Sequence, residues 1–256
     1  MRHAFVVAVC LGFWGTGCVS VSHVQTADTL GQGKFQFAIE PGLGGAGVVS
    51  GGDVEGFYYP HVDLSMRYGV ADRVDLGVRI GSSLAELQSK FLLTQPDNPD
   101  LAISLAPSVM GLFVGTDEDA VVGSYVNVAL PLLVGFKTSG GSEFVLGPRV
   151  SYTRIGAGGG GESAGVNLLS VGTSVGYAIR VTEGFRLMPE VGFSVPVVGK
   201  FHAGDSDSEL GAGFDGGFVQ FKLGFLFGQG RSSRRSSPDS FIDSRGADSG
   251  SGDVDI

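Results

Sequence analysis

His61 and Asp63 have the clearest potential for chemistry in this 256-residue sequence, because they stand two positions apart. On a β-strand both side chains would share one face, where an aspartate can orient a histidine as a general base and a serine can complete a hydrolase. No sequence motif identifies such a serine, and packing in a polar interior is the simpler interpretation of both residues. We therefore predict no catalytic residue.

Other ionisable side chains also alternate with apolar ones, and together they would form one polar face. Charges on such a face must pair or remain hydrated, so they suit either an interior filled with ion pairs or a narrow polar pore. The side chains that we predict to face this lumen are His61, Asp63, Arg67, Arg73, Asp75, Arg79, Glu86, Arg149, Arg180, Arg186 and Glu190.

The remaining motifs do not define a ligand site. Asp205, Asp207 and Glu209 alternate like the carboxylates of a calcium loop, but the turn glycine is not at the required spacing. The glycine run at 156–161 lacks the Lys-Ser/Thr ending of a phosphate loop. We predict no metal and no cofactor. The formal charge of −9 argues against a general nucleic-acid binder, which needs basic groups to displace counterions.

The elements that carry these residues are predicted to be β-strands. Apolar residues alternate with polar or small ones from residue 168 to 181, which is long enough for a membrane-spanning strand. The 44 glycines also disfavour long helices. The same period of two predicts about ten strands, at residues 34–40, 58–70, 73–81, 85–93, 101–113, 125–136, 143–154, 168–181, 185–197 and 219–227.

The two faces of these strands differ in the way that a membrane barrel requires. One face is nearly free of charge and carries aromatic residues towards the strand ends, whereas the other mixes Gly, Ala and Ser with charged residues. Short connections alternate with long ones, as periplasmic turns and external loops do; the long ones are at 41–57, 114–124, 156–167 and 198–217, and the brief one at 82–84 is the exception. We predict an all-β fold, an antiparallel up-and-down transmembrane β-barrel of about ten strands, within roughly 8–12.

The last predicted strand, residues 218–227, resembles the carboxy-terminal assembly signal of bacterial outer-membrane barrels. It ends on Phe227, with Phe225 two positions earlier and Gln220 at the usual polar position, while Lys222 stands where that family usually has glycine. Residues 33–228 as a whole resemble the small, porin-like bacterial outer-membrane β-barrels. The resemblance implies insertion by the barrel assembly machinery and contact with outer-membrane lipids.

The amino terminus resembles a lipoprotein-type signal peptide. Arg2 precedes an apolar run at 4–14 that is too short for a spanning helix, and small residues come directly before Cys18. In bacterial lipoproteins such a cysteine becomes the acylated first residue. Gly15 departs from the leucine usual in that family, and ordinary cleavage near Cys18 is the alternative. Val19 replaces the aspartate that commonly retains lipoproteins at the inner membrane, which implies the outer membrane.

These predictions divide the chain into a signal peptide (1–17), an amino-terminal linker acylated at Cys18 (18–32), the barrel (33–228) and a disordered periplasmic tail (229–256) with too few apolar residues to fold. Both ends are expected on the periplasmic side of the outer membrane. The expected function is a structural role or a narrow passive pore for small solutes. The alternatives are a lipid-modifying, deacylase-like barrel enzyme and a lipid-tethered soluble β-barrel that binds ligands in the periplasm.

Overall fold

The computed structural model of the chain describes residues 22–50, 53–81, 85–96, 98–115, 122–159, 162–203, 206–210 and 216–228. The predicted signal peptide, Cys18 and the predicted tail lie outside these residues. The described part of the chain has no helix that is long and apolar enough to cross a membrane.

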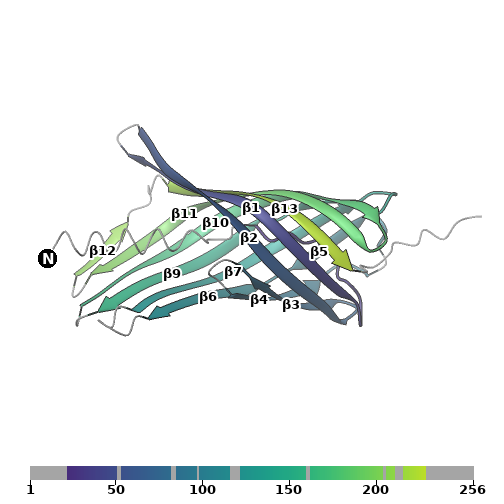
Figure 1. The fold of residues 1–256 in the computed structure, drawn as a ribbon, viewed down its shortest axis with the longest axis horizontal. Coiled ribbons are helices and arrows are strands. Elements are labelled where there is room, and N and C mark those ends of the chain that lie inside the picture. The colour runs from purple at the N-terminus through teal and green to yellow at the C-terminus, as the bar shows by residue number, and fades with distance from the viewer. Residues whose placement is uncertain are drawn as a thin grey trace, which may run out of the picture.

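Antiparallel strands make up most of the described chain and form one sheet (Figure 1). The strands are β1 (Phe35–Ser50), β2 (Asp53–Ala71), β3 (Val74–Ile80), β4 (Ala85–Leu92), β5 (Leu101–Leu105), β6 (Ser108–Gly115), β7 (Val122–Lys137), β8 (Glu143–Leu146), β9 (Arg149–Gly159), β10 (Glu162–Thr182), β11 (Phe185–Ala203), β12 (Ser206–Leu210) and β13 (Gly216–Gly228).

The sheet closes into a barrel because the first strand, β1, pairs with the last, β13. Two wall strands are each interrupted at a proline, which cannot donate to the ladder. Pro107 separates β5 from β6, and Pro148 separates β8 from β9. The short strand β12 pairs with β11 beyond the ring. Within the described residues the ring therefore has ten strand positions, which confirms the predicted antiparallel barrel of about ten strands.

Several strands continue well beyond their predicted boundaries. β1 and β2 pair without a break out to Ser50 and Asp53, so the prediction of a long connection at 41–57 is wrong. This part of β1 has glycines where alternating side chains would be expected, because aromatic rings from β2 occupy the space beside it. A Cβ at Gly45, for example, would lie 2.8 Å from the ring of Tyr58. The predicted long connections at 156–167 and 198–217 are likewise largely strand, in β9, β10, β11, β12 and β13.

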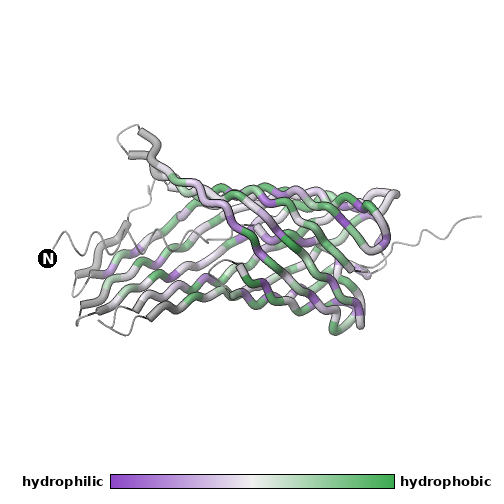
Figure 2. The backbone as a smooth tube through the Cα atoms, viewed as in Figure 1, coloured by the Kyte–Doolittle hydropathy of each residue, from purple (hydrophilic) through white to green (hydrophobic). Residues whose placement is uncertain are grey.

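The two faces of the wall are sorted by polarity, and hydropathy alternates along the strands (Figure 2). Large apolar side chains point outward and are exposed, whereas polar and charged ones point inward and are buried. A soluble barrel has the opposite arrangement, with its apolar residues inside. Exposed residues of the outer wall include Leu64, Met66, Leu76, Leu87, Val109, Val128, Leu130, Phe136, Val150, Val171, Val191, Phe193 and Phe221.

Candidate functional site in the barrel lumen

The lumen contains a segment of the chain itself, residues 22–31, which we call the lumen segment. Nearly every residue in it is buried, and Val24 and Ala27 are completely buried. The segment is irregular in structure and precedes β1. In place of the predicted linker, the structure thus has a stretch of chain packed inside the barrel.

Side chains from the wall satisfy the backbone groups of the lumen segment, which have no strand partner of their own. The carboxylate of Asp75 on β3 accepts the N–H of Leu30, with both oxygens 3.1 Å from the nitrogen. Other wall residues bind further backbone groups. The carbonyls of Ser22, Val24 and Thr26 accept from Arg79, Arg67 and Lys90, in that order. The N–H groups of Ser22, His23 and Ala27 donate to Gln220, Glu190 and Glu143, in that order.

Two glycines of the wall let the segment approach closely. A Cβ at Gly135 on β7 would lie 2.8 Å from the Cβ of Ala27, and one at Gly224 on β13 would overlap the side chain of Val24. Val24 and Ala27 also belong to the one apolar cluster among the described buried residues, with Leu133, Val145 and Met188. The segment is therefore fitted to the wall by shape as well as by hydrogen bonds.

A network of buried charges lies around the segment. Lys222 of β13 is completely buried, and its Nζ lies 2.6 Å from Asp63 Oδ2 and 3.2 Å from Glu40 Oε2. Arg79 pairs closely with Glu86 and lies 3.7 Å from the same oxygen of Glu40. A buried ion pair survives only with good geometry and further hydrogen bonds, and this network provides both.

His23, in the lumen segment and not in a strand, connects that segment to the network. Its Nε2 lies 2.9 Å from Glu86 Oε1. Burial is the largest influence on the imidazole, and the nearby Arg79 adds to it; both lower the pKa of His23 well below its ordinary value.

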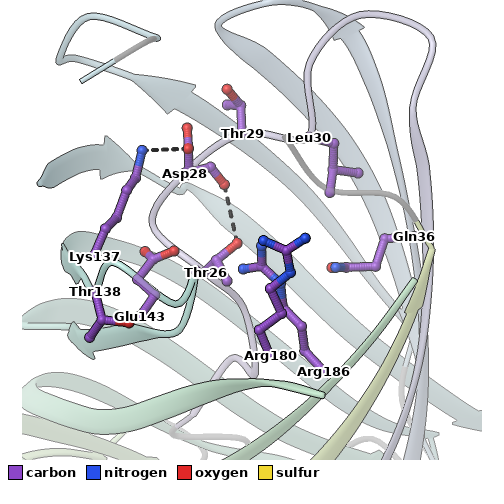
Figure 3. Close-up of a pocket in the computed structure, with 11 residues that line it drawn as sticks. Thr26, Asp28, Thr29, Leu30, Gln36, Lys137, Thr138, Glu143, Arg180 and Arg186 are labelled. Atoms are coloured by element: carbon purple, nitrogen blue, oxygen red, sulfur yellow. Dashed lines mark hydrogen bonds and ion pairs between the residues drawn. The ribbon is translucent and has the colours of Figure 1, made fainter. Parts of the chain in front are cut away.

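Polar side chains gather around the lumen segment at the short-turn end of the barrel, where a short turn joins β10 to β11 (Figure 3). Lys137 of β7 pairs with Asp28 of the lumen segment at 2.6 Å. Arg180 and Arg186, which are direct partners across β10 and β11, lie beside each other at this mouth. The cavity left between these groups and Glu143 is about 30 Å³, which is room for about one water molecule.

The structure buries most of the side chains that the sequence assigned to the lumen: His61, Asp63, Arg67, Asp75, Arg79, Glu86, Arg149 and Glu190. Arg180 and Arg186 are partly buried at the mouth. Arg73 is a correction. It stands in the turn between β2 and β3, is exposed, and donates to the carbonyls of Leu93 and Thr94. The strand begins one residue later than predicted, so Arg73 has no place on the inward face.

His61 and Asp63 share the inward face but are engaged separately. Asp63 pairs with Lys222, while Nε2 of His61 accepts from the side-chain amide of Gln220 at 2.9 Å. A hydrolase needs the carboxylate to hold the imidazole and the imidazole to face a nucleophile. In this geometry the two residues do neither.

Four ionisable residues with important contacts here were not predicted from the sequence: Glu40, Lys90, Glu143 and Lys222. Glu40, Lys90 and Lys222 already stood on the polar faces of predicted strands, so the alternation alone would have found them. The lumen segment carried no such signal, since it has no strand period. Among the described residues, no group of three or more His, Cys, Asp or Glu side chains is arranged to hold a metal ion.

These features define a closed antiparallel β-barrel with an apolar exterior and a polar lumen occupied by its own chain. No protein-family model matches the sequence, and no curated protein does. Among solved structures, the chain is similar to the outer-membrane protease OmpT of Escherichia coli, with a TM-score of 0.42 and 9% identity over 82% of this chain and 100% of that one.

Two further structures are similar to a comparable degree. The translocator domain of the autotransporter NalP of Neisseria meningitidis has a TM-score of 0.42 and 11% identity, over 88% of this chain and 95% of that one. The attachment invasion locus protein Ail of Yersinia pestis has a TM-score of 0.38 and 11% identity, over 77% and 99%. The barrel architecture itself follows from the strand pairing described above.

Proposed function

We propose that the protein is an integral outer-membrane barrel with a structural role, whose lumen is closed by residues 22–31. The observation that carries the membrane part of the proposal is the apolar outer wall. On β10, outward positions from Leu169 to Val181 are almost all apolar. At about 3.3 Å per residue and a tilt of about 40°, they cover roughly 30 Å of height, enough for the apolar band of about 25 Å on such barrels.

The lumen segment favours the structural role over a standing pore. A ten-stranded barrel is near the size at which side chains alone fill the interior, and here a length of chain is added to them. The cavity beside Glu143 at the short-turn mouth has room for about one water molecule, which supports a closed lumen over an open pore. Short turns connect the strands at this end of the barrel, which supports its placement on the periplasmic side. The opposite end, where the strands extend beyond the apolar band, would then lie outside the cell.

Heating tests the membrane part. The membrane fraction, run on a gel with and without boiling in detergent, should show a band that shifts on boiling, because a closed barrel resists the detergent until heated. Release of the protein into the soluble fraction, with no shift, would contradict a membrane barrel.

Planar bilayers test the closed lumen. The refolded full-length barrel should give no stepwise conductance under conditions in which a known porin conducts. Steady channels from the unmodified protein would contradict closure by the lumen segment and would favour the passive pore.

A further inference from the structure

A hollow of about 530 Å³ opens where β7, β9, β10 and β11 rise above the apolar band. Its polar side chains are Ser124, Tyr152, Arg154, Asn167 and His202. Tyr152 and Arg154 lie on the outer wall, because Ser151 and Thr153, which alternate with them on β9, are buried in the lumen. Ser124, Asn167 and His202 lie on the same face, because they are at cross-strand positions in register with this outward face of the sheet. These polar side chains therefore face the surroundings of the barrel and not its interior.

The polar side chains form a connected row across three strands. Arg154 is the direct cross-strand partner of Asn167, and the hydroxyl of Tyr152 donates to Asn167 Oδ1 at 3.0 Å. On the other side, Asn167 Nδ2 lies 3.0 Å from Nε2 of His202. These contacts fix the orientation of the amide and of the phenol, so the row is organised before any ligand arrives.

Arg154 sets the charge of the hollow. No acidic residue is among the described residues that line it, and Arg154 is exposed. Lys200 is the next cross-strand neighbour of Asn167, and on β12 the positions opposite Lys200 and His202 are Glu209 and Asp207. The acidic positions are therefore on β12, next to the β11 side of the hollow, whereas the β9 side of the hollow presents the guanidinium of Arg154.

The floor of the hollow is bare backbone. Gly156 and Gly165 are direct cross-strand partners, and Gly158 follows on the same face. A Cβ at Gly156 would meet only the hydroxyl oxygen of Ser124, at 2.8 Å. Space for a ligand exists because side chains are missing from this stretch of wall.

The height of the hollow on the wall indicates what it meets. Asn167 is the first outward position of β10 beyond Leu169, where the apolar band ends. Directly below the polar row, Val150, Leu169 and Val198 are exposed and apolar. In the membrane proposed above, the row lies at the level of lipid headgroups and the apolar residues at the level of acyl chains.

We propose that this hollow binds the phosphorylated headgroup of an outer-leaflet lipid. A phosphate oxygen accepts from the guanidinium of Arg154, which is suited to planar, charge-assisted recognition of phosphate. Headgroup hydroxyls bond to Asn167 and the neighbouring polar side chains, and the acyl chains lie along Val150, Leu169 and Val198. A free phosphate would use only the first of these contacts. The site rests on the proposed membrane location.

Native mass spectrometry of the full-length barrel, released from detergent micelles, tests the site. The probes are a bisphosphorylated lipid A and its fully dephosphorylated form. The unmodified protein should retain one phosphorylated lipid and little of the other. Arg154→Gln should lower the retained fraction about tenfold, as expected for loss of a charge-assisted hydrogen bond. Gly156→Val should do the same by filling the floor, and valine is favourable in a strand. Arg73→Gln, an exposed arginine at the opposite end, is the matched control and should bind normally.

Equal retention of the two lipid forms by the unmodified protein, retention of neither, or unchanged binding by Arg154→Gln and Gly156→Val would each overturn the proposal. Displacement of the lipid by millimolar inorganic phosphate would identify a site for free phosphate and overturn the lipid assignment. The heat-dependent gel shift is measured for each variant. Variants that keep the shift but bind the phosphorylated lipid normally refute only the site, whereas an unmodified protein without the shift refutes the membrane barrel itself.

Discussion

Replacing Lys222 by methionine is predicted to destabilise the barrel strongly. Methionine keeps an unbranched apolar side chain of similar length, but the amino group between Asp63 and Glu40 is lost, and both carboxylates stay buried. Breaking a buried ion pair by removing one partner costs about 3–5 kcal/mol. Glu40 retains Ser65, which donates to it at 2.6 Å, and Arg79 at 3.7 Å. Asp63 loses its shortest contact, so it carries most of the cost.

The assay is urea unfolding of the refolded barrel, followed by the fraction that still shows the heat-dependent gel shift. With a slope of about 2–3 kcal/mol per M urea, the midpoint should fall by roughly 1–2.5 M. Lys34→Met, at an exposed lysine directly before β1, is the control and should unfold with the unmodified protein.

A second substitution tests the assigned cause. Asp63→Asn, added to Lys222→Met, removes the uncompensated carboxylate and should restore at least about 1 kcal/mol, measured as a coupling free energy in a double-mutant cycle. An unchanged midpoint for Lys222→Met, or additive losses in the double variant, would refute the reasoning.

Three other predictions concern the lumen segment and the amino terminus. Because the folded barrel lowers the pKa of His23, the unfolded chain binds a proton more tightly than the folded one, and the free energy of unfolding should fall as the pH drops from about 8 to about 5. The urea midpoint should fall less over this pH range in His23→Gln than in the unmodified protein. Equal falls in the two proteins would contradict a role of His23 in this pH dependence. Leucine in Gly224→Leu should collide with Val24, displace the lumen segment and produce conductance in planar bilayers. Gly184→Ala is the control and should not conduct, because its Cβ would have nothing within 4 Å. A folded Gly224→Leu barrel without conductance would contradict closure of the lumen by the close packing of Val24 against Gly224. Cys18→Ser should abolish incorporation of labelled palmitate, and a label retained by the variant would exclude acylation at this cysteine.

The strands could be predicted from the sequence because most wall strands alternate in polarity within the apolar band, and a period of two leaves little choice of face. The prediction failed beyond that band, where glycines replace side chains beside Tyr58 and Tyr59, and at Arg73, where one residue decides between turn and strand. The lumen segment could not be predicted, since its stability comes from partners far along the chain. Ser22, for example, bonds to Gln220, 198 residues away, and no local pattern encodes that contact.

The lumen segment also constrains the order in which the barrel can form. It precedes β1, yet it bonds to Gln220 of β13, which is the last strand to be made and the partner that closes the ring. A stretch of chain cannot easily enter a barrel that has already closed, so we expect residues 22–31 to be inside before β1 and β13 pair. The wall strands then pair with the lumen segment already between them. Contacts of such long sequence separation form slowly, so we expect the pairing of β1 with β13 to be a late step of assembly.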